Sequence, residues 1–128
     1  MYRSEFCDID YNKELNIVLT TWKKFCCKDD YRNPLLYSLE IMQENNDCQY
    51  VADTRTGFEN DPADTQWLLD VFLLQAAKTS CKMIFFIIDK DNKLKDELES
   101  QSAELKKLFE VHYCFSFDEV ESILNESR

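Results

Sequence analysis

The clearest candidate for a functional site is a short polar segment around Gly57, the single glycine of the sequence. The segment follows an expected strand and consists of Asp53, Thr54, Arg55, Thr56, Gly57 and Phe58. Open α/β sheets place functional surfaces at the carboxyl ends of parallel strands, so this segment could form a docking or anion-binding loop. In the alternative, structural interpretation, Asp53 caps the turn or pairs with Arg55, and Gly57 supplies a positive φ.

A second acidic position, Asp89, follows the apolar run Met83–Ile88 and would lie at the same edge of the sheet as Asp53. Two neighbouring carboxylates are the groups that Mg²⁺ binding or acid–base chemistry requires. Aspartates at such positions more often end strands and cap helices. We therefore treat Asp89 as a secondary candidate at the strand edge and predict neither a metal site nor a cofactor.

His112 and Cys114 share one face of the last expected strand and could form a Cys–His nucleophile. Such a nucleophile needs exposure and a third, orienting group, so we expect both residues to be buried and no catalytic residue to be present. No C-x-x-C pair occurs, which disfavours a zinc site. Four of the six cysteines are expected to be small apolar residues in or beside strands: Cys7, Cys48, Cys81 and Cys114.

Composition narrows the class of protein. The 128 residues carry a formal net charge of −10, which disfavours a nucleic-acid partner because phosphate binding needs a basic surface. Hydrophobic residues make up 45% of the chain, too many for a disordered acidic tail. No signal peptide is apparent, and no apolar run approaches the roughly 20 residues of a membrane span. We expect a cytoplasmic protein with a single domain over residues 1–128.

Hydrophobic periodicity predicts the elements that position these residues. A period of two indicates an N-terminal hairpin of Phe6 to Tyr11 and Leu15 to Trp22. A helical stripe from Tyr31 to Met42 indicates a helix that begins at Asn33 or near Asp29, and Tyr31 favours the earlier start. A short strand, Cys48 to Thr54, follows this helix.

The second half of the chain alternates in the same way. A helix is expected from Pro62, capped by Asp61, with Trp67, Val71 and Leu74 as its buried stripe, which Leu68 and Phe72 widen. The next expected elements are the strand Met83–Ile88 and a helix from about Asn92 to Phe109. The residues expected to form the buried face of that helix are Leu94, Leu98, Leu105 and Leu108. The strand Val111–Phe115 follows, and a Ser116–Glu119 capping box begins the last helix.

The resulting order, ββαβαβαβα, predicts an α/β fold with right-handed crossovers. We expect a mostly parallel sheet of about five strands, with the first strand antiparallel at one edge and the helices mainly on one face. If all helices covered one face, the other would carry apolar and aromatic groups. That face would then be a homodimer interface or a small-molecule groove, and we favour the homodimer.

Three segments, together with the order of elements, resemble the STAS domain, the SpoIIAA-like fold of the anti-sigma-factor antagonists. They are Trp22-Lys23-Lys24-Phe25, Asp30-Tyr31-Arg32 and Asp53-Thr54-Arg55-Thr56-Gly57. The resemblance covers Glu5 to Leu124 and is strongest with small bacterial STAS-like proteins of unassigned function.

The resemblance implies a non-enzymatic regulatory or protein-interaction module. Regulatory members of the family carry Asp-Ser-Ser-Gly or Asp-Ser-Thr-Gly after the equivalent strand, and a partner kinase phosphorylates the hydroxyl residue before the glycine. Asp53 and Gly57 match that motif, and Thr56 is the corresponding phosphoacceptor. Arg55 makes the motif one residue longer here. The alternative function for the same fold is a small-molecule or anion-binding sensing module.

Overall fold

The computed structural model describes residues 2–24, 28–55, 62–89 and 106–126. Its strands are β1 (Tyr2–Arg3), β2 (Cys7–Asn12), β3 (Ile17–Trp22), β4 (Gln49–Asp53), β5 (Met83–Ile87) and β6 (Glu110–Cys114). Its helices are α1 (Asp29–Glu44), α2 (Pro62–Trp67), the π-helical segment η1 (Leu68–Phe72), α3 (Leu73–Ala76) and α5 (Phe117–Glu126). The α/β class predicted from the sequence is confirmed.

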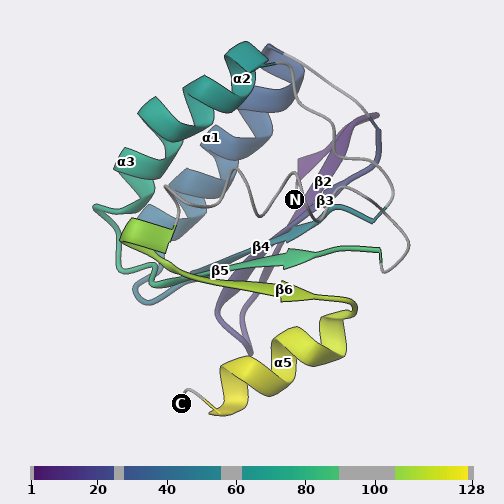
Figure 1. Ribbon diagram of the computed structural model, residues 1–128, viewed down its shortest axis with the longest axis vertical. Helices are drawn as coiled ribbons and strands as arrows, with labels where there is room; N and C mark the ends of the chain where they lie inside the picture. Colours follow the sequence, from purple (N-terminus) through teal and green to yellow (C-terminus); the bar gives the residue numbers. More distant parts are fainter. Residues whose placement is uncertain (1, 25–27, 56–61, 90–105, 127–128) are drawn as a thin grey trace.

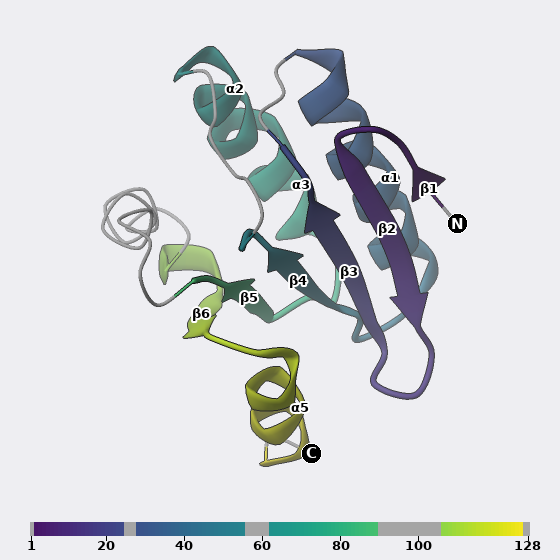
Figure 2. The ribbon, with the colours of Figure 1, turned by 90° about the vertical axis from the view of Figure 1, so that its right-hand side faces the viewer.

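The strands form one sheet in chain order, β1-β2-β3-β4-β5-β6 (Figure 2). The pairs β3–β4, β4–β5 and β5–β6 are parallel, as the alternation of strands and helices predicts. The hairpin β2–β3 is antiparallel, also as predicted. The described residues give six strands rather than about five, because Tyr2–Arg3 adds a short antiparallel strand outside β2.

Helices cover both faces of the sheet (Figure 1). The helices α1, α2 and α3 lie on one face, and α5 lies on the other. Val120 and Leu124 of α5 pack against Val51 and Phe85 of the sheet, and all four are buried. The condition for a bare apolar face, that all helices lie on the same side, is therefore not met. The expected homodimer through an open sheet face stays a prediction.

Helix α1 begins at Asp29, the earlier of the two starts considered, so Pro34 lies inside it. Its buried residues include Tyr31, Leu35, Leu39 and Met42, the stripe predicted from the sequence. These side chains belong to the larger of two apolar clusters, which fills the space between α1, the segment α2–η1–α3 and the sheet.

The predicted buried stripe of the second helix is wrong at Val71 and Leu74 and confirmed at Phe72. Val71 and Leu74 are exposed, whereas Phe72 and Leu73 are buried. The cause is η1, whose wider turn is closed by the Leu73 N–H donating to the carbonyl of Leu68. A π-helical turn inserts an extra residue and rotates the residues that follow. The face that reaches the core therefore moves by one position along the chain.

The expected helix from Asn92 to Phe109 falls largely outside the described residues, including Leu94, Leu98 and Leu105. Lys106 to Leu108 are helical, but Leu108 is exposed, which corrects its predicted burial. The capping box before α5 is confirmed: the Glu119 N–H donates to Ser116 Oγ at 3.4 Å, and the Ser116 N–H donates to Glu119 Oε2 at 3.2 Å.

Candidate functional site

The start of the candidate loop is fixed to the sheet. Thr54 directly follows β4, and both its N–H and its hydroxyl donate to the carbonyl oxygen of Ile87, each at 2.9 Å. Its side chain is buried. Thr54 is therefore inaccessible to a partner or a modifying enzyme, and its role is to continue the link between β4 and β5.

Asp53 and Arg55 form an ion pair across the turn that Thr54 begins. Asp53 Oδ1 accepts hydrogen bonds from Arg55 Nε at 3.0 Å and from the Arg55 backbone N–H at 3.2 Å. Asp53 Oδ2 accepts from Nη2 at 2.8 Å. The structural interpretation of Asp53, in which it pairs with Arg55, is therefore what the structure shows. The Arg55 side chain nevertheless keeps 45% of its surface exposed.

Asp89 comes to the same edge of the sheet. Asp53 pairs in register with Ile87, so Asp89 lies two positions beyond that pair at the carboxyl end of β5, where it is exposed. The hydrogen bond with Asp53 raises the pKa of Arg55, and the charge of Asp89 adds to the increase. Asp53, Arg55 and Asp89 thus form a charged cluster, called the edge cluster below. The other loop candidates, Thr56, Gly57 and Phe58, lie outside the described residues.

The edge cluster holds two carboxylates and one guanidinium, so its formal charge is negative. Within the described parts of the chain, no three His, Cys, Asp or Glu side chains gather in a way that could hold a metal ion. The Asp53 carboxylate is thus already engaged in orienting Arg55.

His112 and Cys114 lie on one face of β6. Cys114 is buried as predicted, but the predicted burial of His112 is wrong, because its side chain is 28% exposed. The His112 ring stacks on Phe85 with centroids 5.2 Å apart, and its Nε2 lies 2.8 Å from Glu110 Oε2. Cys114 is buried, and burial raises the pKa of its thiol to about 11, with the charge of Glu119 adding to the shift. A neutral, enclosed thiol is a poor nucleophile.

The three other cysteines expected to act as small apolar residues are buried as well. Cys7, Cys48 and Cys81 all belong to the larger apolar cluster and are free thiols. Burial raises the pKa of Cys48 to about 11 and that of Cys81 to about 12. The vicinal pair Cys26 and Cys27 lies outside the described residues.

These shifts predict slow thiol chemistry. In a variant with Cys26→Ser and Cys27→Ser, iodoacetamide at pH 8 should leave the four remaining cysteines unmodified in the folded protein and alkylate all four in urea. The thiolate is the reacting species, and with a pKa of about 11 roughly one thiol in a thousand is ionised at pH 8. Intact-mass spectrometry counts the adducts.

Alkaline pH should also destabilise the fold. The unfolded chain ionises its thiols near pH 9.0, whereas folded Cys114 stays neutral up to about 11, so the free energy of unfolding should fall as the pH rises through this interval. Rapid alkylation of Cys114 in the native protein at pH 8 would contradict its burial under α5.

A second charged cluster, which no sequence pattern predicted, joins two helices. Asp64, only 1% exposed, accepts a hydrogen bond from the Lys28 N–H at 2.8 Å through Oδ2 and from Arg32 Nε at 2.9 Å through Oδ1. The Arg32 guanidinium lies 5.5 Å from the centre of the Trp67 ring. Asp64 lies in the first turn of its own helix α2, and its carboxylate also accepts a hydrogen bond at the start of α1.

Within the described residues, no helix combines the length and the apolar character that crossing a bilayer requires. No protein-family model matches the chain, and neither the curated proteins nor the solved structures give a match. A function must therefore be argued from the residues and their geometry.

Proposed function

We propose that this chain is a non-enzymatic protein-interaction module, similar to the anti-sigma-factor antagonists, and that it docks through the edge cluster. The observation that carries the proposal is the position of Arg55. Its side chain is half-exposed at the carboxyl edge of a parallel sheet, where a double contact with Asp53 holds its guanidinium in place.

A side chain that is already oriented loses less conformational entropy when it binds, which favours Arg55 as an anchor. The contacts with Asp53 use Nε and Nη2, and a guanidinium has five N–H donors, so three remain for hydrogen bonds to a partner. Thr54 holds the start of the loop on the sheet through its two bonds to Ile87, which further limits motion of Arg55.

The alternative, an anion-binding sensing module, is less favoured at this position. Asp53 already neutralises Arg55, and Asp89 adds a further negative charge to its surroundings. A free anion would meet a cluster of net negative charge. A protein surface can instead offer acceptors to Arg55 and donors to the two carboxylates in one interface, which is why we place a protein partner here.

The test is affinity capture from the native host with variants of the edge cluster. Wild-type protein should recover a partner that Arg55→Ala loses, because truncation removes the anchor. Lys82→Ala is the matched control, since Lys82 is an exposed cation directly before β5, at the opposite end of that strand. Equal recovery with wild type and Arg55→Ala would contradict docking at the edge cluster.

The same experiment addresses the switch that the family resemblance assigns to Thr56. Phosphorylation adds nearly two negative charges beside Arg55 in the sequence. We expect Thr56→Glu to lose the partner, Thr56→Ala to retain it, and phosphosite mapping to find modified Thr56. Unmodified Thr56 under all growth conditions, with both variants binding like wild type, would rule out the switch but leave docking through Arg55 intact.

A further inference from the structure

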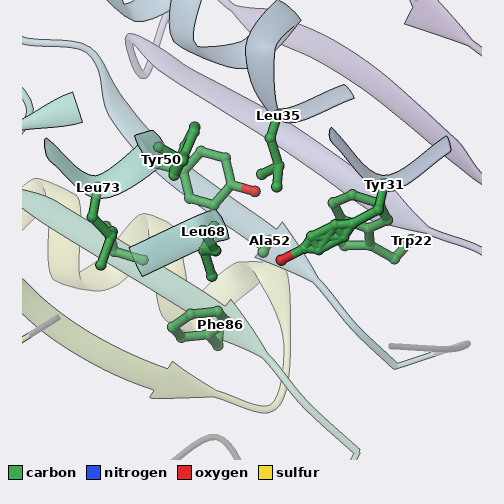
Figure 3. A pocket seen from close by; sticks show the side chains of 10 residues that line it. Trp22, Tyr31, Leu35, Tyr50, Ala52, Leu68, Leu73 and Phe86 are labelled. Carbon is green, nitrogen blue, oxygen red and sulfur yellow. The ribbon is translucent and has the colours of Figure 1, made fainter. Parts of the chain in front are cut away.

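The segment α2–η1–α3 is apolar on its outer side as well as on the side that faces the sheet. Figure 3 shows Leu68 and Leu73 on the inner side, where they lie near Phe86 of β5. The core is therefore filled without Val71 and Leu74, which are 39% and 54% exposed. A helix that is apolar all round is ordinarily buried on all sides. The outer side of this segment is thus a candidate interaction surface.

A third exposed apolar residue, Leu36 of α1, adjoins this surface. Helix α1 lies beside η1 and α3 in the layer that covers the sheet (Figure 1). Arg32, one turn before Leu36, lies over the Trp67 ring of α2, so Leu36 is on the side of α1 that faces the segment. Leu36 is 44% exposed. We call the surface formed by Leu36, Val71 and Leu74 the outer helix face.

Opposite charges bracket each exposed leucine of the outer helix face. On α1, Arg32 and Glu40 lie four residues before and four residues after the leucine, and around the leucine of α3 Asp70 and Lys78 do the same. Glu40, Asp70 and Lys78 are exposed, and so is a third of the Arg32 side chain. These two cations and two anions balance, although the whole chain carries a formal charge of −10. Copies of so acidic a chain repel each other, and the outer helix face escapes that repulsion.

We propose that the outer helix face is the contact between two copies of this chain, related by a two-fold axis, with each helix antiparallel to its own copy. A two-fold contact uses the same surface on both copies. Antiparallel helices that cross at the exposed leucine place the residue four positions before it opposite the residue four positions after it on the second copy. Arg32 then meets Glu40 of the second copy, and Asp70 meets its Lys78. Parallel helices would instead bring like charges together.

The size of the outer helix face indicates a weak dimer. Helix α1 has 16 residues and is about 24 Å long, and two helices packed side by side are roughly 20 Å wide. Such a face covers roughly 500 Å² on each copy and about 1,000 Å² in all, which is the lower limit for a specific interface. Dimers should therefore form at high protein concentration and dissociate on dilution.

The test is sedimentation equilibrium at protein concentrations from about 1 μM to about 1 mM. The mean mass of the wild-type protein should rise with concentration from that of one chain towards that of two. Asp70→Lys and Lys78→Glu should each weaken association at least about tenfold, because each puts like charges opposite one another twice in the symmetric contact. An equimolar mixture of these two variants should associate like wild type, because the introduced charges then face opposite ones.

Two controls match these changes. Lys13→Glu makes the same change of charge at an exposed position in the turn between β2 and β3, outside the outer helix face, and should associate like wild type. Leu36→Ala should raise the dissociation constant about tenfold, because both copies lose the side chain. Leu108→Ala truncates a leucine of similar exposure on another element and should leave the constant unchanged.

Wild-type protein that stays monomeric up to about 1 mM would overturn the proposal, because the outer helix face would then be left to another protein or to the chain itself. A dimer that persists in Lys78→Glu and Leu36→Ala would place the contact on another surface and overturn it too, as would a mixture of the two charge variants that fails to associate. None of these substitutions alters the edge cluster, so the outcome is independent of the proposed docking through Arg55.

Discussion

Replacing Asp64 with alanine should lower the free energy of unfolding by about 3 kcal/mol, measured by urea denaturation. The substitution leaves the Lys28 N–H and the Arg32 guanidinium without the buried carboxylate that accepts their hydrogen bonds. Removing one partner of a buried pair costs about 3–5 kcal/mol, and Arg32 keeps a third of its side chain in water, so we expect the lower end of this range.

Asp70→Ala is the control for the loss of an aspartate from the same helical segment. Asp70 is exposed and accepts a side-chain hydrogen bond from Gln66, so its replacement should change stability by about 0.5 kcal/mol or less. A double-mutant cycle adds a second criterion: Arg32→Ala should cost less in the Asp64→Ala background than in wild type. Equal stability of Asp64→Ala and Asp70→Ala would show that the pair does not join the two helices.

Phe85→Ala should lower the free energy of unfolding by about 3–5 kcal/mol, the largest effect we expect from a single truncation. Phe85 is 0% exposed and lies in a row across the sheet between Val51 of β4 and His112 of β6. Its face of the sheet is covered by α5 through Val120 and Leu124. The substitution therefore opens a cavity where β4, β5 and β6 meet α5.

Leu108→Ala serves as the comparison, because Leu108 is 48% exposed. This substitution should lower the free energy of unfolding by about 1 kcal/mol or less. Thermal and urea unfolding measure both variants. Limited proteolysis is an independent measurement, because weakened packing under α5 should make the C-terminal helix easier to cleave in Phe85→Ala. A loss below about 1 kcal/mol in Phe85→Ala would mean that α5 does not pack on this face in solution.

Much of the fold could be predicted because local pattern and tertiary structure agree. The stripe from Tyr31 to Met42 located α1 and decided its start at Asp29. The alternation of strands and helices predicted three parallel pairings, and all three are present. The Ser116–Glu119 box marked the start of α5 because its capping bonds join residues close together in the sequence.

The second helix resisted prediction for a physical reason. The search for a buried stripe assumes 3.6 residues per turn, and that assumption fails at η1. Val71 and Leu74 continue the ideal period from Trp67 and are exposed, whereas Leu73, which the predicted face did not include, is buried beside the predicted Phe72. Nothing in the apolar residues of this segment distinguishes an α-turn from a π-turn.

Among the charged contacts, one could be predicted from the sequence and another could not. The pairing of Asp53 with Arg55 was foreseeable because the two residues are neighbours in the chain. The role of Asp64 was not, because its partners Lys28 and Arg32 lie more than 30 residues away and belong to another helix. A carboxylate in the first turn of a helix is ordinarily assigned to that helix, and here it also serves a neighbour.

The strict chain order of the sheet has a consequence for how the protein is made. Each strand pairs with the strand before it, so no strand has to be inserted between two that have already joined. During synthesis, the N-terminal hairpin can form first, and each crossover then adds one strand at the growing edge. The last helix, α5, can pack only when β4 and β5 are in place, so burial of Phe85 should report completion of folding on the ribosome.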